Sequence, residues 1–212
     1  MKQFIYKIIL FLILTLNKIT LKIFKKNILI QLQFDLRKRS FLQNKVLMKN
    51  LKLLNTNPFT NFRYKNMING EEKTIKWIDS FKKQNSKKII FFDIGSCLGN
   101  FSIYASVKHK KNIIIYSFEP SPQNLNILVS NITKNKLNNI IVIPNAVTDE
   151  NKVNTIYENE NFEGSARRSF KYNKGYDLKK IKYKSKYQTF GINIFNLIKN
   201  KVIEKPNFIK ID

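Results

Sequence analysis

The fold is decided by residues 89–122, which read IIFFDIGSCLGNFSIYASVKHKKNIIIYSFEPSP. Two short apolar runs, at 89–92 and 113–118, are rich in β-branched and aromatic residues. Such runs are typical of strands that are buried on both faces of a parallel sheet. Residues 100–109, which lie between them, have the length and polarity of a helix. The stretch therefore predicts strand, helix and strand in an α/β domain with right-handed crossovers.

The same alternation extends in both directions along the chain. Ser121 followed by Pro122 predicts the start of a helix, because Ser is a favoured N-cap and Pro suits the first helical position. Further helices are predicted at 71–84 and 192–203, and further strands at 140–143 and 208–211. The predicted fold class is an α/β domain with a parallel sheet of four core strands, preceded by basic amphipathic N-terminal helices. Polar residues dominate the interval 151–187, so we expect an irregular insertion there.

Composition excludes several classes of protein. The 212 residues include 39 Lys+Arg against 14 Asp+Glu, with one Cys, one His and one Trp. Structural zinc sites, iron–sulfur clusters, haem ligation and disulfide frameworks need more Cys or His than this, so we expect no metal site. A Cys-His or Ser-His-Asp nucleophile would have to use His109, the only imidazole. The formal net charge of +25 favours anionic partners, although A+T-rich codon usage would give a similar excess of Lys.

The basic excess is densest in residues 1–55, which carry 12 Lys+Arg and one acid. The uncharged apolar run at 8–17 is ten residues long, whereas a spanning helix needs about 20, so we predict no transmembrane segment. Drawn as one helix, the region carries a single basic stripe formed by Lys18, Lys22, Lys25 and Lys26. Such a helix lies in a membrane interface, packs on its own domain, or belongs to a cleaved signal. We expect residues 1–36 to bind an anionic membrane surface, with the protein cytoplasmic and peripheral at the inner face of the membrane.

Two isolated carboxylates indicate a ligand site. Asp93 and Glu119 each lie at the C-terminal end of a predicted strand, and ligands bind at this edge of open α/β sheets. Gly95 and Gly99 follow in a strand-to-helix turn that also contains Ser96, and the absent Cβ atoms let a ligand approach the backbone. A carboxylate at Glu119 can accept both hydroxyls of a ribose. Together these residues predict an adenosine site.

The cofactor is inferred from charge. A dinucleotide needs the spacing GxGxxG, so that backbone amides and a helix N-terminus hold its pyrophosphate. Here the spacing is DxGxxxG, and an aspartate beside the turn repels a pyrophosphate. The same aspartate suits S-adenosylmethionine, whose ammonium and sulfonium groups are cationic. The alternative is that Asp93 and Glu119 only cap turns and that the glycines only mark a loop.

Four segments carry a family resemblance: FFDIGSCLGNFSIYAS (91–106), YSFEPSPQNLNILVSNI (116–132), IIVIPNAVTDE (140–150) and PNFIKID (206–212). They resemble the FkbM-type methyltransferases. The resemblance covers roughly residues 71–212 and implies a Rossmann-like methyltransferase fold that binds S-adenosylmethionine. It also implies methyl transfer to a hydroxyl oxygen, on a small-molecule or glycan acceptor such as a sugar or a secondary metabolite.

The site residues follow by position. The cofactor-binding residues that we predict are Asp93, Gly95, Ser96, Gly99, Glu119, Asn145 and Ala146. Among them, the resemblance implies that Glu119 takes the ribose and that Asn145 and Ala146 lie near the adenine. Asp212 is the candidate for orienting or deprotonating an acceptor hydroxyl.

We divide the chain into a basic amphipathic helical segment at 1–55, a helical lead-in at 56–87 and an S-adenosylmethionine-binding domain at 88–212. The family pattern continues beyond the final IKID into further strands, so we expect a C-terminally truncated catalytic domain. Its acceptor pocket would lack walls, and the strand at 208–211 would have an unpaired edge. We therefore expect a chain of this length to be poorly soluble, or to bind the cofactor weakly without transferring methyl groups.

Two other functions remain open. One is an NAD-dependent oxidoreductase, and the other is a non-enzymatic basic module associated with a membrane or with RNA. In residues 171–187 tyrosines are interleaved with lysines, but nucleic-acid binding is less favoured there because such runs are more often solvated loops. Arg167 and Arg168 could contact an anionic substrate, although we expect them to be exposed.

Overall fold

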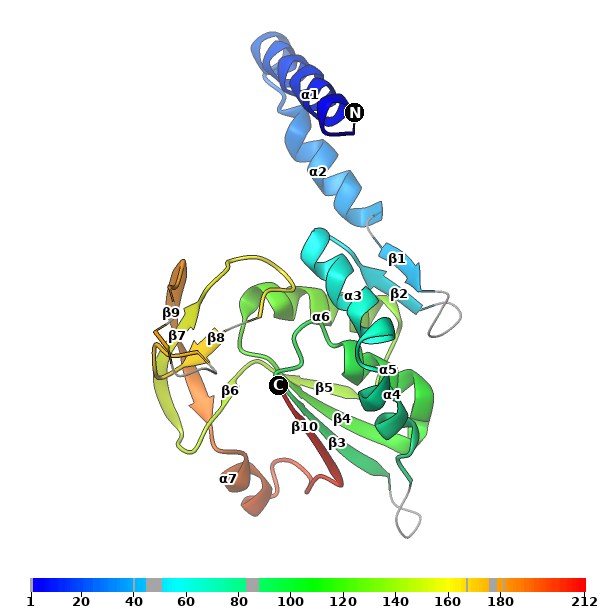
Figure 1. Ribbon diagram of the computed structural model, residues 1–212, viewed down its shortest axis with the longest axis vertical. Helices are drawn as coiled ribbons and strands as arrows, with labels where there is room; N and C mark the ends of the chain where they lie inside the picture. The colour runs from blue at the N-terminus through cyan, green and yellow to red at the C-terminus, as the bar shows by residue number, and fades with distance from the viewer. Residues whose placement is uncertain are drawn as a thin grey trace. The chain divides into compact units, whose positions relative to one another are not determined.

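A computed structural model describes residues 2–39, 41–44, 51–82, 88–166, 168–175, 179–180 and 182–212. The chain divides into two compact units, Met1–Leu42 and Gln43–Asp212 (Figure 1). Strand β1 (Phe41–Asn44) pairs with β2 (Leu51–Leu54) in a two-stranded sheet.

The first unit contains two helices, α1 (Lys2–Phe24) and α2 (Ile28–Arg39). They are separate because Lys25 leaves the helical conformation with a φ of +52°. The Asn27 side chain then caps α2, where its Oδ1 accepts the backbone N–H of Leu29 at 3.1 Å. The predicted N-terminal helices are present, but the four lysines of the predicted stripe do not share one helix. Lys18 and Lys22 lie on α1, whereas Lys25 and Lys26 lie in the turn before α2.

Helix α1 is long and apolar enough to cross a membrane. It has 23 residues, and its most apolar window has a mean hydropathy of 1.8. None of its described residues is buried. The prediction of no transmembrane segment considered only the ten uncharged residues at 8–17, whereas lysines near helix ends can extend their ammonium groups to the headgroups. A signal sequence near an N-terminus satisfies the same criteria of length and composition.

The second unit is built on a four-stranded parallel sheet, which confirms the predicted Rossmann-like α/β class. Its strand order is β10-β3-β4-β5, so β10 lies at one edge (Figure 1). All neighbouring pairs are parallel. The four strands are β3 (Ile89–Ile94), β4 (Ile113–Phe118), β5 (Ile140–Ile143) and β10 (Phe208–Ile211).

Both faces of this sheet are covered, because the strand residues alternate between two hydrophobic clusters. Ile89 and Phe91 of β3 belong to the cluster that includes Tyr104 of α5. Ile90 and Phe92 belong to the cluster that includes residues of α7. The helices of this unit are α3 (Pro58–Asn69), α4 (Glu72–Asp79), α5 (Asn100–His109), α6 (Pro122–Lys134) and α7 (Ile194–Lys199), with a 3-10 turn at Lys110–Asn112.

Helix α5 has the predicted bounds, whereas two other helices are shorter than predicted. Helix α4 ends at Asp79, and residues 83–84 of the predicted helix lie outside the described part of the chain. Helix α7 begins only after Asn193, whose Oδ1 accepts the N–H of Phe195 at 2.9 Å. The preceding strand extends to Ile192, so the predicted helix start at 192 is wrong.

The interval 151–187 is not an irregular insertion. It contributes most of a second sheet, in which β9 pairs in parallel with β6, and β7 pairs antiparallel with both β9 and β8 (Figure 1). The prediction failed because these strands carry many polar residues and pair across a long sequence separation. The strands are β6 (Ala146–Val147), β7 (Lys152–Glu158), β8 (Arg168–Phe170) and β9 (Ser185–Ile192).

Candidate functional site

A cavity of about 740 Å³ lies at the carboxyl ends of the parallel strands. Its lining includes Gly95, Glu119 and Asp212, which directly follow β3, β4 and β10. Strands β3, β4 and β5 progress in one direction across the sheet, whereas β10 pairs with the other side of β3. The cavity therefore adjoins the point where the strand order reverses, which is where open α/β sheets bind ligands.

The turn after β3 requires glycine at position 95. Gly95 has a φ of +77°, and its N–H donates to the Phe118 carbonyl at 2.9 Å. A Cβ at this position would lie 3.3 Å from Cβ of Asp212. Both the left-handed conformation and the close approach of Asp212 favour a residue without a side chain. The predicted glycine turn thus borders the cavity through Gly95.

Glu119 lies where the sequence predicted, at the end of β4 and on the cavity wall. Its Oε2 accepts the N–H of Cys97 at 2.8 Å, and its Oε1 accepts the N–H of Ser121 at 2.9 Å. Burial raises the pKa of Glu119, and the Arg168 guanidinium and these backbone N–H groups oppose the rise. Each carboxylate oxygen offers two acceptor positions, so both oxygens retain the capacity to accept a hydroxyl.

Asp93 is fully buried and is not among the residues that line the cavity. It lies on the same face of β3 as Ile89 and Phe91, because side chains alternate along a strand. Its Oδ2 accepts the Ser102 hydroxyl of α5 at 2.6 Å. Burial raises the pKa of Asp93, and the Lys210 ammonium, 3.9 Å from its Oδ1, opposes the rise. In this structure Asp93 connects β3 to α5 and β10.

Ser96 and Gly99 also lie outside the cavity lining. Ser96 is buried, and its backbone N–H donates to the Phe118 carbonyl at 3.0 Å, so it helps to hold the turn. Gly99 has a φ of +79° and immediately precedes α5. A Cβ on Gly99 would overlap Cδ1 of Leu128 in α6. The second glycine of the motif therefore serves the close packing of α6 against the start of α5.

We expect Gly99→Ala to lower the free energy of unfolding by about 1–3 kcal/mol, the range for overpacking a filled core. Leu128 is fully buried and has little room to move, and the positive φ adds strain to any L-residue. Urea unfolding would measure the loss. Gly70→Ala is the matched control, because Gly70 has a φ of −116° and is exposed. Equal stability of the two variants would contradict the packing role of Gly99.

The remaining predicted residues all line the cavity, namely Asn145, Ala146 and Asp212. Asn145 is fixed by a hydrogen bond from its Nδ2 to the Phe190 carbonyl, at 3.1 Å. Asp212 is exposed, and its Oδ1 lies 2.9 Å from Nζ of Lys210. Lys210 is therefore placed between the carboxylates of Asp212 and Asp93.

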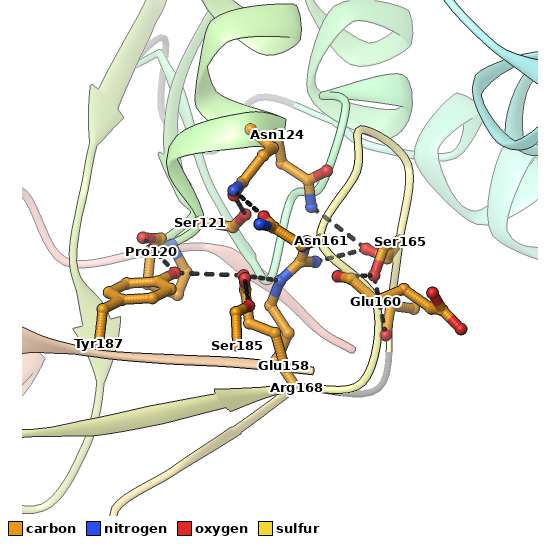
Figure 2. Close-up of polar contacts among 12 residues, drawn as sticks. Pro120, Ser121, Asn124, Glu158, Glu160, Asn161, Ser165, Arg168, Ser185 and Tyr187 are labelled. Carbon is orange, nitrogen blue, oxygen red and sulfur yellow. Dashed lines mark hydrogen bonds and ion pairs between the residues drawn. The ribbon is translucent and has the colours of Figure 1, made fainter. Parts of the chain in front are cut away.

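A buried charge network reaches the cavity at Arg168, and sequence reasoning did not predict it. Arg168 on β8 donates from Nε to Oε1 of Glu158 at 2.6 Å, and the Glu158 side chain is completely buried. Glu158 Oε2 also accepts the hydroxyl of Ser185 at 2.9 Å. Figure 2 shows Arg168 between Glu158 and the loop that carries Ser165. The expectation that Arg168 is exposed is wrong, since only 12% of its side chain is accessible; Arg167 lies outside the described residues.

Comparison with known proteins gives no family assignment. A scan against models of protein families found no match, and a search of curated proteins found none either. Solved structures to which part of this chain is similar include a precorrin-6y C5,15-methyltransferase from Geobacter metallireducens GS-15, at 19% identity and a TM-score of 0.31. Another is a SAM dependent methyltransferase from Aquifex aeolicus, at 18% identity and a TM-score of 0.33.

These alignments cover 50% and 44% of this chain, and 45% and 47% of the two solved chains, respectively. This chain thus matches about half of the length of either protein. A third structure, described as the METTL16 MTase domain, has 15% identity, a TM-score of 0.30, and 52% coverage of both chains.

The chemistry available in the cavity is that of carboxylates and fixed cations. The described residues contain no group of three or more His, Cys, Asp or Glu that could hold a metal ion. Burial and the neighbouring Glu119 raise the pKa of the Cys97 thiol to about 11, so the thiol is protonated at neutral pH and is a poor nucleophile. The site is therefore suited to binding and orienting ligands through hydrogen bonds and charge.

Proposed function

We propose that the chain is an S-adenosylmethionine-dependent methyltransferase. The observation that carries the proposal is the arrangement of Glu119 and Asp212 beside the Gly95 turn, at the point where the strand order reverses. A ribose would hydrogen-bond to Glu119, and the adenine would lie near Asn145 and Ala146. The cationic end of the cofactor would lie at the Asp212 carboxylate.

In the structure, the carboxylate that favours a cationic cofactor is Asp212 and not Asp93. Asp93 points away from the cavity, so it is not the carboxylate that would repel a pyrophosphate. Asp212 takes that role, because its Cβ lies against the Gly95 turn. A pyrophosphate at this turn would meet the Asp212 carboxylate, whereas an ammonium or sulfonium group would be attracted to it.

We assign the transfer to a hydroxyl oxygen of a sugar or secondary-metabolite acceptor, in line with the FkbM resemblance. The bound cofactor supplies an electrophilic methyl group. Asp212 would orient the acceptor hydroxyl or take its proton, and Lys210, 2.9 Å from Asp212, would hold that carboxylate in place. The rate would come mainly from positioning the acceptor oxygen in line with the methyl group.

Calorimetric titration with S-adenosylhomocysteine and with NAD tests this proposal. We expect S-adenosylhomocysteine to bind and NAD to bind much more weakly. NAD is the sharpest alternative probe, because the arginines and lysines that line the cavity could attract its pyrophosphate. Binding of NAD without binding of S-adenosylhomocysteine would favour an oxidoreductase. Binding of neither would favour a non-enzymatic module.

We also propose that the first unit holds the protein at the cytoplasmic face of an anionic membrane. Support comes from α1, whose apolar residues are exposed, with 68% of Phe4 and 68% of Phe11 accessible. The lysines near its end and in the following turn would meet anionic headgroups, at roughly 1 kcal/mol each.

Sedimentation with vesicles measures this association. We expect the full chain to bind vesicles that contain phosphatidylserine more strongly than phosphatidylcholine vesicles, and to lose this preference as the salt concentration rises. A variant with Gln at Lys18, Lys22, Lys25 and Lys26 should also lose the preference. The matched control replaces four exposed lysines of the second unit by Gln, at Lys65, Lys73, Lys136 and Lys205. Equal loss in both variants would show that net charge, and not the first unit, determines binding.

A further inference from the structure

The cavity contains both described arginines of the second unit. Only five of the 39 cationic residues in the chain are arginines. Arg63 on α3 and Arg168 on β8 lie far apart in the sequence, yet both line the cavity. Nearly all other positive charges in this chain are carried by lysine. A guanidinium differs from an ammonium group in its planar fork of donors, which matches carboxylate and phosphate groups.

The two guanidinium groups are anchored to consecutive carbonyls of one loop. Arg63 Nε donates to the Gly164 carbonyl at 3.0 Å. Arg168 Nη1 donates to the Ser165 carbonyl, as Figure 2 shows. Both side chains therefore bind the same short stretch of the loop, and both line the cavity.

The loop that anchors them is itself fixed. The N–H of Gly164 donates to Oδ1 of Asn124 in α6 at 3.0 Å, and Nδ2 of Asn57 donates to the Glu163 carbonyl at 3.1 Å. Gly164 has a φ of +79°, and a Cβ there would lie 3.1 Å from the backbone N of Thr60. The loop therefore packs directly against the start of α3. The positions of both guanidinium groups are set by the fold before any ligand binds.

Part of this donor set is unused within the protein. Glu158 pairs with Nε of Arg168, yet Nη2 of Arg168 is buried and has no hydrogen-bond partner among the described residues. Buried donors without partners are rare in native proteins, and each one calls for an explanation. Arg63 is anchored through Nε, so its two terminal nitrogens retain donor capacity for a ligand. Lys180 and Lys182 on the same cavity lining add positive charge.

We propose that Arg63 and Arg168 form an oxyanion clamp that binds a carboxylate or phosphate group of the ligand in this cavity. The identity of that ligand rests on the proposed function. The clamp would hold either the carboxylate of the methionine moiety of the cofactor or an anionic group of the methyl acceptor. In the second case the acceptor is an acidic molecule, such as a phosphorylated or carboxylated sugar.

Arg63→Gln is the variant of choice, because Arg63 is only half-buried and its loss leaves the Glu158 pair intact. Three probes are titrated into the full chain at constant ionic strength. S-adenosylhomocysteine carries the carboxylate of the amino-acid moiety of the cofactor, whereas 5′-methylthioadenosine lacks this group. Inorganic pyrophosphate represents an acidic acceptor. Lys65→Gln is the matched control, because it removes the same charge from an exposed position on the same helix. Arg63→Lys keeps the positive charge but loses the planar arrangement of N–H donors. Its affinity for the probes should therefore lie between those of Arg63→Gln and the wild type.

If the clamp binds the cofactor, Arg63→Gln weakens S-adenosylhomocysteine binding roughly 10- to 100-fold and leaves 5′-methylthioadenosine unchanged. If it binds the acceptor, only pyrophosphate binding weakens, by a similar factor. Should neither adenosine compound bind the wild-type chain, the proposed function fails, and the pyrophosphate titration still decides the clamp. Equal affinities of Arg63→Gln and Lys65→Gln for all three probes would overturn the clamp.

Discussion

Arg168→Met is expected to lower the free energy of unfolding by about 3–5 kcal/mol, the usual loss when one partner of a buried ion pair is removed. The Glu158 side chain has no accessible surface, and its Oε1 lies 2.6 Å from Nε of Arg168. Without the guanidinium, a carboxylate would remain buried, and its partners among the described residues would be the hydroxyls of Ser185 and Tyr187. Methionine keeps much of the side-chain volume, so the loss would report on charge and not on a cavity. Urea unfolding followed by circular dichroism would measure it.

The double variant Glu158→Gln/Arg168→Met separates charge from packing. It removes both charges and retains an amide that can hydrogen-bond to Ser185, so we expect it to be more stable than Arg168→Met. Lys152→Met is the control for losing a cation, since Lys152 is exposed on the neighbouring strand β7. If the double variant unfolds more easily than the single one, the buried charge is not the source of the instability.

The β3-α5-β4 unit could be predicted from the sequence because its signals are local. The apolar runs at 89–92 and 113–118 are continuous, and the helix between them has its observed bounds. The second sheet could not be predicted in this way. Pairs such as Ile156 with Tyr187 join residues about thirty positions apart, on strands where polar and apolar residues mix. Only the tertiary structure shows that Ile156 is buried.

The candidate site was predicted in part. Glu119, Gly95 and Asp212 line the cavity because each directly follows a parallel strand, and such positions share one edge of the sheet. Asp93 is still within its strand, so strand alternation directs its side chain to the α5 face. A carboxylate within the strand, as at Asp93, therefore faces the helix, whereas one directly after the strand, as at Glu119, reaches the cavity.

Arg63 was missed because its partner is distant in sequence. Arg168 was named as a possible contact for an anionic substrate, but it was expected to be exposed. Arg63 contacts a loop about a hundred residues later, at Gly164, and no spacing rule connects the two. The sequence signal that could have found both residues is the rarity of arginine in this chain. In a chain that uses lysine for most of its positive charge, an arginine marks a position where the shape of the guanidinium matters.

Glu119→Ala is expected to weaken S-adenosylhomocysteine binding roughly 10- to 100-fold, the equivalent of hydrogen bonds to a charged group. The carboxylate is nearly inaccessible, lies on the cavity wall and is held by the N–H groups of Cys97 and Ser121. A ribose hydroxyl would therefore meet an acceptor that is already oriented. Glu204→Ala is the control, because Glu204 is exposed and lies outside the cavity lining. Thermal unfolding of each variant would separate lost binding from lost folding.

The same carboxylate predicts how binding depends on pH. Protonation would remove acceptor capacity from Glu119, so affinity should fall as the pH decreases through the pKa of this group. Because burial raises that pKa, the fall should begin above the pH at which an ordinary glutamate titrates. Glu119→Ala has no carboxylate to protonate and should show a flatter profile over this range. A wild-type profile that matches the variant, with equal affinities at neutral pH, would mean that Glu119 only holds the turn between β3 and α5.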